Sequence, residues 1–288
     1  EMSKYRFHSF PAVNTLFTAI ANHRGFEITT LRRDVETDGR HAVVEFTEDW
    51  RADALRRDFT INSLSMARDG NVYDYTGGID DLNAARVRFV GDPASRIAED
   101  YLRILRYFRF QSRYGHSPPD PATREALRSG TPGLARLSAE RVWMELRRIL
   151  SAPDPVAGVA LMAELGVLQA VAPELDPARL APLQAVGAPP DPILRLAAML
   201  TGDPIVFAER LKLSNEERDR LVRLRDTPTP TLSDTDDALR RLLADHRRQD
   251  LIDRTWLSRG PDTLRHRLAA LPQPIFPLFG KDVLAIGV

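Results

Sequence analysis

The spacing of apolar and polar residues divides the chain into two parts of different character. Up to about residue 90 the apolar runs are short, rich in β-branched residues and interrupted by turns, which is typical of a mixed α and β region. The polar residues 36–40 predict a turn between the first two strands. The elements predicted here are a helix over 51–66 and strands over 26–32, 41–47, 72–75 and 87–90.

From residue 92 onward the strand pattern disappears, and proline and glycine separate segments with helical periodicity. The predicted helices cover 94–114, 121–129, 138–151, 155–164, 192–201, 204–211, 214–226, 235–246 and 247–258. The Pro-rich segments 188–192 and 227–231 predict loops. The two patterns together predict an α+β fold, with a β-containing N-terminal part followed by an all-α-helical remainder.

Composition narrows the class of protein. Hydrophobic residues make up 43% of the 288 residues, which is enough for real cores and too many for a disordered chain. The absence of cysteine excludes a disulfide scaffold and thiolate metal ligands, and it suits a reducing cytosol. We find neither a membrane span nor a signal peptide, so we expect a cytoplasmic protein without a membrane partner, unless a targeting segment precedes Glu1. No protein partner can be inferred.

Charge is balanced overall but concentrated locally. Forty basic and forty acidic side chains give no net charge, which by itself argues against a generic nucleic-acid binder. The segment from residue 96 to residue 113 contains five arginines and two acidic residues, an excess of three positive charges. A local basic segment of this kind would suit a protein that grips one end of an RNA.

The segment Glu99-Asp-Tyr-Leu-Arg-Ile-Leu-Arg106 carries the most informative chemistry. On one helix, Glu99 and Arg103 stand four apart, and Asp100, Arg103 and Arg106 step by three, so these side chains would share a face. A carboxylate there accepts from the exocyclic amine of cytosine or adenine, while an arginine donates to ring acceptors. The alternative is a helix with an acidic first turn and surface ion pairs.

A second candidate lies in Arg56-Arg-Asp-Phe-Thr-Ile-Asn62. The two arginines could hold a triphosphate, and the neighbouring carboxylate could accept from a ribose hydroxyl. The alternative is a solvated helical face. The order of four motifs decides between these interpretations: RRDxxxN at 56–62, DxxGGxxDL at 74–82, EDxxRxxR at 99–106 and SxERxxxEL at 138–146.

This ordered set resembles the class II tRNA nucleotidyltransferase and poly(A) polymerase family, which includes the CCA-adding enzymes. The resemblance is dense from about residue 25 to 168, whereas residues 1–17 match nothing in the family pattern. It implies a partial nucleotidyltransferase head over 1–92, a helical neck with the nucleotide-template motif and RNA-binding helices over 93–151, and a tRNA-binding helical body and tail over 152–288. It also implies template-independent addition of CCA to tRNA 3′ ends from CTP and ATP.

The resemblance assigns roles residue by residue. Arg57, Asp58 and Asn62 would contact the nucleotide sugar, and Asp100 and Arg103, supported by Glu99 and Arg106, would pair with the incoming base. RNA binding is expected at Arg109, Arg113 and Arg141. Asp74 and Asp81 are expected to be structural or hinge residues. The list of nucleotide-binding candidates is therefore Arg57, Asp58, Asn62, Glu99, Asp100, Arg103 and Arg106.

The metal site is the part of the family pattern that this sequence lacks. Nucleotidyl transfer uses carboxylates that hold Mg²⁺, and the family supplies them from a Gly-Gly-x-x-Arg-Asp turn and an Asp-x-Asp strand. Neither occurs in these 288 residues, and no catalytic residue is assigned. Glu27 is the only candidate metal ligand. We expect a chain truncated at both ends or a divergent, inactive product.

Three alternatives stay open at this stage. A poly(A) polymerase shares the motifs, although Tyr101 and the segment 107–110 resemble the CCA-adding branch more closely. A non-catalytic RNA- or nucleotide-binding remnant would explain the missing carboxylates. A purely structural helical scaffold would bind neither nucleotide nor tRNA.

Overall fold

The computed structural model describes residues 16–21, 24–37 and 42–274. The chain forms two compact units. The N-terminal unit comprises residues 1–84 and 88–100, and the helical unit comprises residues 85–87 and 101–288. The predicted α+β class is confirmed. The three predicted domains, 1–92, 93–151 and 152–288, stay predictions.

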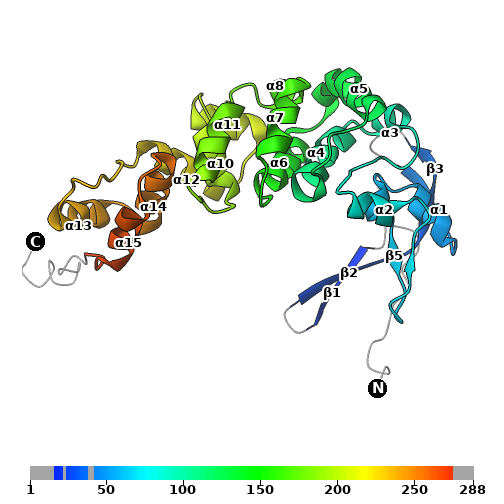
Figure 1. Ribbon diagram of the computed structural model, residues 1–288, viewed down its shortest axis with the longest axis horizontal. Coiled ribbons are helices and arrows are strands. Elements are labelled where there is room, and N and C mark those ends of the chain that lie inside the picture. Colours follow the sequence, from blue (N-terminus) through cyan, green and yellow to red (C-terminus); the bar gives the residue numbers. More distant parts are fainter. Residues whose placement is uncertain (1–15, 22–23, 38–41, 275–288) are drawn as a thin grey trace, which may run out of the picture. The chain divides into compact units, whose positions relative to one another are not determined.

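The strands of the N-terminal unit form three antiparallel pairs within its described residues (Figure 1). They are β1 (Leu16–Ala21) with β2 (Arg24–Thr29), β3 (Arg32–Thr37) with β4 (Ala42–Phe46), and β5 (Ser65–Met66) with β6 (Val72–Tyr73). The predicted strands over 41–47 and 72–75 are confirmed by β4 and β6. The predicted strand over 26–32 is wrong at its end, because β2 stops at Thr29 and β3 begins at Arg32. The sequence pattern missed β1, β3 and β5.

The helix predicted over 51–66 is wrong beyond residue 55. Helix α1 (Trp50–Leu55) begins at Asp49, whose carboxylate accepts from the N–H groups of Arg51 and Ala52. The chain then turns into a short 3-10 helix, η1 (Thr60–Asn62). Phe59 lies in this turn and is fully buried against Phe89, with ring centroids 4.9 Å apart. This long-range contact outweighs local helical propensity, and it reduces the predicted strand over 87–90 to a single bridge between these two residues.

Two further helices complete the N-terminal unit, α2 (Gly78–Asn83) and α3 (Pro93–Glu99). Gly78 packs so closely on η1 that a Cβ at this position would lie 2.2 Å from the carbonyl oxygen of Thr60. Glycine is therefore required for α2 to pack on η1.

The helical unit begins with α4 (Leu102–Tyr114), which packs against α6 (Ala139–Leu150) and α7 (Val156–Glu164). The remaining helices are α5 (Pro121–Gly130), α8 (Val167–Val171), α9 (Leu180–Ala185), α10 (Pro192–Met199), α11 (Pro204–Leu211), α12 (Asn215–Asp226), α13 (Asp236–Asp245), α14 (Arg248–Leu257) and α15 (Asp262–Ala270), with the 3-10 helices η2 (Thr131–Arg136) and η3 (Pro177–Arg179). Except for 94–114, the predicted helices are confirmed to within two residues at each end. The pattern missed α8, α9 and α15.

Buried leucines, together with other aliphatic and aromatic side chains, form the core of the helical unit. At its C-terminal end a separate cluster joins α13, α14 and α15, and its central members are Leu239, Leu243, Leu251, Leu264 and Leu268. Within the described residues, no helix combines the length and the apolar character needed to cross a membrane.

Candidate nucleotide-binding site

A buried carboxylate, Asp53, organises the first predicted motif. Its two oxygens accept from Arg56 Nη2 at 2.5 Å and from Arg57 Nη2 at 2.7 Å. The backbone N–H of Arg32 also donates to Asp53, at 3.2 Å. Burial by itself would raise the pKa of Asp53, but the hydrogen bonds from Arg57, Arg56 and the Arg32 backbone outweigh it and hold the pKa below its usual range.

The two arginines of the first motif therefore have an internal partner that sequence reasoning missed. Asp53 stands three and four residues before Arg56 and Arg57, a spacing that signals ion pairs on a helix. The Arg56 side chain is 14% exposed, whereas that of Arg57 is 39% exposed. Only Arg57 thus presents a substantial surface to a ligand, and nucleotide contact by Arg57 stays a prediction.

Asp58 and Asn62 lie in the loop that follows these arginines. The Asn62 side-chain oxygen accepts from the backbone N–H of Phe59 at 3.0 Å and closes the turn. The carbonyl of Asp58 accepts from the N–H of Val90 at 3.0 Å, and the N–H of Thr60 donates to the carbonyl of Arg88. The loop is held from both sides, so the half-buried Asp58 occupies a fixed place. Asn62 shapes this loop, and its predicted contact with the sugar is untested.

Arg96 connects this loop to Glu99. Its Nη2 donates to the carbonyl oxygens of Arg56 and Arg57 at 2.6 and 2.8 Å, and its Nη1 donates to Glu99 at 2.7 Å. The Arg96 side chain is 13% exposed, so little water competes for these bonds. One guanidinium therefore fixes the backbone of the first motif and the first carboxylate of the third motif within the same unit.

The helix predicted over 94–114 is interrupted at Asp100. This residue is extended, with φ −155° and ψ 111°; α3 ends before it and α4 begins at Leu102. Because the backbone is not helical at Asp100, helical spacing cannot place Glu99 and Asp100 on a common face with Arg103. The expectation that these side chains share one helical face is therefore wrong. The boundary between the two units falls directly after Asp100.

Arg103 and Arg106 lie on α4 in the helical unit. Both are partly exposed, while Leu102, Leu105 and Phe108 are buried, so the apolar and basic faces of α4 are separate. Their predicted role in pairing with the incoming base stays a prediction.

Asp74 and Asp81 have structural surroundings that agree with their expected role. Asp74 accepts from four backbone N–H groups, those of residues 76–79, at 2.8 to 3.0 Å. Burial opposes ionisation of Asp74, but these bonds outweigh it and lower its pKa. Asp81 is fully buried, and it accepts from the Thr60 hydroxyl at 2.6 Å and from Arg88 Nε at 2.8 Å.

The predicted RNA-binding arginines differ in their surroundings. Arg109 donates to the fully buried Glu145 of α6 at 3.0 Å, which ties α4 to α6. Arg113 is exposed and lies over the ring of Tyr114 at 5.8 Å. Arg141 on α6 is half-buried. RNA binding by these three residues stays a prediction, and Arg113 has the most accessible side chain.

The metal prediction falls outside what the structure describes. Glu27 lies on β2 opposite Thr18, but its side chain is not among the described ones. Among the described residues, no group of three or more His, Asp or Glu side chains is placed to hold a metal ion.

Two family profiles match the chain. The Poly A polymerase head domain covers residues 2–88, and the probable RNA and SrmB-binding site of polymerase A covers residues 118–179. Because the head-domain match starts at residue 2, the expectation that residues 1–17 lie outside the family pattern is wrong.

Sequence relatives extend the match over nearly the whole chain. The CCA tRNA nucleotidyltransferase 1, mitochondrial, of Homo sapiens is 37% identical over 302 residues, covering 94% of this chain and 66% of the relative. The CCA-adding enzyme of Lacticaseibacillus paracasei is 34% identical over 201 residues, covering 67% and 50%. The chain thus spans between half and two thirds of the length of these relatives.

Solved structures share the fold. The Bacillus stearothermophilus CCA-adding enzyme in complex with CTP aligns with a TM-score of 0.67 and 25% identity, covering 93% of this chain and 70% of that chain. A tRNA nucleotidyltransferase complexed with a primer tRNA and an incoming ATP analog aligns with a TM-score of 0.65 and 18% identity, covering 88% and 78%. The ordered motifs, both family profiles and the identity to these relatives agree: this chain belongs to the class II tRNA nucleotidyltransferase and poly(A) polymerase family.

Proposed function

We propose that the protein is a template-independent RNA nucleotidyltransferase that adds CCA to tRNA 3′ ends from CTP and ATP. The observation that carries this proposal is the Arg96 bridge, which holds the loop before Asp58 and the carboxylate of Glu99 in one unit. A sugar-binding loop and a base-reading segment must keep a constant spacing to select one nucleotide. The names of the relatives, CCA-adding enzymes and CCA tRNA nucleotidyltransferases, support the same reaction.

Base selection is assigned to the segment that follows this bridge. The carboxylate of Asp100 would accept from the exocyclic amine of cytosine or adenine, and Arg103, supported by Arg106, would donate to ring acceptors. Guanine and uracil present a carbonyl oxygen in place of that amine, so the carboxylate would repel them. Because the backbone at Asp100 is extended, this assignment rests on the family motif rather than on helical spacing.

Sugar recognition is assigned to the loop over 56–62. Asp58 would accept from a ribose hydroxyl, and the partly exposed Arg57 would donate to the phosphates. Asn62 would act by holding the loop through the N–H of Phe59. Arg56, whose guanidinium is shielded by Asp53, would support the loop without touching the nucleotide.

Mg²⁺ stays a proposal that rests on the family resemblance. The described carboxylates do not fit a two-metal site, because Asp53, Asp74 and Asp81 are each occupied by arginine or backbone donors. We derive no catalytic step through the metal. Glu27 is the one residue proposed as a ligand.

Primer extension tests the proposed reaction. The full-length natural protein would be incubated with a tRNA lacking its CCA end, with CTP, ATP and Mg²⁺. We expect addition of two C residues and one A residue, and failure to add either nucleotide would overturn the proposal. Long tails made from ATP alone would identify a poly(A) polymerase. Binding of CTP or tRNA without any incorporation would identify the non-catalytic alternative.

Location is the last element of the proposal. We propose a cytoplasmic protein, consistent with the absence of cysteine. Several relatives are named mitochondrial, so an organellar location is the alternative. Cell fractionation with an antibody against the natural protein distinguishes the two.

A further inference from the structure

An arginine-lined cleft lies in the helical unit, bounded by η3, α9, α10, α11, α12 and α14. It consists of two adjoining cavities of about 410 and 270 Å³. Both cavities are lined by Arg179, Ala197, Arg254 and Leu257; Arg259 lines the larger and Arg225 the smaller. No carboxylate is among the described residues that line either cavity.

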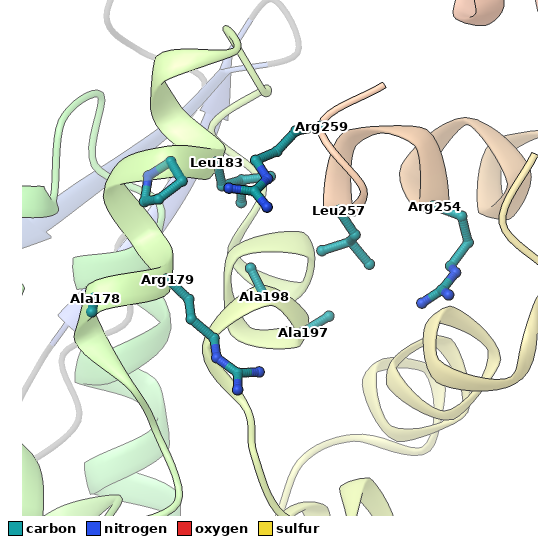
Figure 2. Close-up of a pocket in the computed structure, with 9 residues that line it drawn as sticks. Ala178, Arg179, Leu183, Ala197, Ala198, Arg254, Leu257 and Arg259 are labelled. Atoms are coloured by element: carbon teal, nitrogen blue, oxygen red, sulfur yellow. The ribbon is translucent and has the colours of Figure 1, made fainter. Parts of the chain in front are cut away.

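The guanidinium groups reach this cleft from different elements. Figure 2 shows Arg179 on one side and Arg254 on the other, with Ala197, Ala198 and Leu257 between them. Arg259, in the turn after α14, lines the same cavity as Leu183 (Figure 2). The cleft is therefore lined by both apolar side chains and arginines. None of its residues belongs to the candidate nucleotide-binding site.

The positive charge of the cleft contrasts with the rest of this region. Nearby arginines are neutralised by close carboxylates: Arg210 by Glu174 at 2.6 Å, Arg220 by Asp191 and Asp253 at 2.7 Å, and Arg223 by Asp250 at 2.7 Å. Among the described residues, Arg179 is the one cleft arginine that forms an ion pair, with Asp176 at 3.2 Å. Asp203 lies within electrostatic reach of Arg225. Two acidic residues beside the cleft therefore offset part of four positive charges.

Arg254 is the member that most needs an anion. It is half-buried and donates to neutral acceptors, the carbonyl of Leu224 at 2.9 Å and the hydroxyl of Thr229 at 2.5 Å. Its Nε is buried and has no hydrogen-bond partner within the part of the chain that the structure describes. Burial lowers the pKa of Arg254, because the charged form loses hydration that no carboxylate replaces. A partly buried charge of this kind destabilises the fold unless an anionic ligand compensates it.

We infer that this cleft is a phosphate-binding site. The four arginines that line the two cavities can donate to the oxygens of a phosphate, which can accept from more than one arginine at once. A neutral ligand would leave the charge of Arg254 uncompensated. The phosphate comes from an RNA backbone or from a free polyphosphate, and the first source, which we favour, rests on the proposed function.

The test uses two double variants with the same change in charge. Arg179→Gln with Arg259→Gln removes the two exposed arginines of the larger cavity and leaves Arg254, which supports the fold. Arg240→Gln with Arg241→Gln is the control on α13. The control is matched because Arg240, like Arg179, pairs with an aspartate three residues before it, and Arg241, like Arg259, is exposed. Thermal melting by circular dichroism verifies that both variants fold.

Two binding measurements on the full chain separate the sources of phosphate. Calorimetry with pyrophosphate reports a free polyphosphate. Fluorescence anisotropy with a labelled RNA hairpin, across a salt series, reports the RNA backbone. For RNA we expect the cleft variant to bind about tenfold more weakly, and the slope of log K against log salt to fall by about 1.5, since each lost contact removes about 0.7–0.9. The control variant should change affinity less than about twofold.

Each outcome decides the inference. Loss of pyrophosphate binding in the cleft variant alone supports the site with a free polyphosphate as its ligand, and loss of RNA binding supports the backbone. Equal losses in both variants, or no loss in either measurement, would overturn it. Because neither measurement records nucleotide incorporation, failure of the proposed CCA addition would leave the phosphate site standing.

Discussion

Replacing Asp53 by asparagine tests the central contact of the candidate site. The change keeps the size of the side chain and removes the negative charge that Arg56 and Arg57 share. Both guanidinium groups would then face a neutral amide. Because the carbonyls of these arginines are bound by Arg96, the disturbance should spread to the loop that carries Asp58.

The magnitude follows from the burial of the three side chains. Removing one partner of a buried ion pair costs about 3–5 kcal/mol, because the remaining charge is left without compensation. The Asp53 side chain is 7% exposed and that of Arg56 is 14% exposed, so this pair is well shielded. Arg57 is 39% exposed, and water would compensate it in part. We therefore expect the N-terminal unit to lose about 3 kcal/mol, the low end of the range.

The effect should depend on pH in a defined direction. The pKa of Asp53 is lower in the folded protein than its ordinary value. A depressed pKa contributes stability that is fully present above the unfolded value, about 3.9, and is lost as the pH falls through the folded value. The difference between the natural chain and Asp53→Asn should therefore be full at pH 7 and shrink below about pH 4.

Hydrogen exchange measured by mass spectrometry resolves this effect to the N-terminal unit. At pH 7, a loss of about 3 kcal/mol should accelerate exchange in residues 50–62 by roughly 100-fold, while α6 keeps its protection. Glu48→Gln is the control, because Glu48 is an exposed carboxylate just before the same helix and should cost no more than about 0.5 kcal/mol. If Asp53→Asn exchanges like Glu48→Gln, the reasoning is refuted.

Three further predictions concern other parts of the chain. Gly78→Ala should destabilise the N-terminal unit by about 2 kcal/mol in a urea titration, because its Cβ would lie 2.2 Å from the carbonyl oxygen of Thr60; an unchanged midpoint would contradict this packing. Glu145→Gln should destabilise the helical unit by about 3 kcal/mol, since Arg109 would lose its buried partner, and a thermal melt within a degree of the natural chain would disprove this. In the full-length protein, Asp100→Ala should relax discrimination between CTP and UTP by roughly tenfold or more; a uniform fall in kcat/KM with selectivity kept would favour a purely structural carboxylate.

The sequence by itself determined the order of motifs and most of the helical unit. Helices such as α11 and α12 follow from apolar periodicity and from local signals such as the capping Ser214, because a helix is specified by neighbours three and four residues away. The motifs could also be identified from the sequence alone, since they are defined by the order of residues along the chain. Family membership therefore required no coordinates.

Tertiary structure decided how the candidate site is held. The end of α1 at Leu55 depends on the contact between Phe59 and Phe89, and the position of the Asp58 loop depends on Arg96, forty residues from Arg56. The break at Asp100 was equally hidden, because the local spacing suited one continuous helix. The physical reason is the same in each case: burial of a ring or pairing of a charge across a long stretch of chain outweighs the few tenths of a kcal/mol by which local propensity favours a helix.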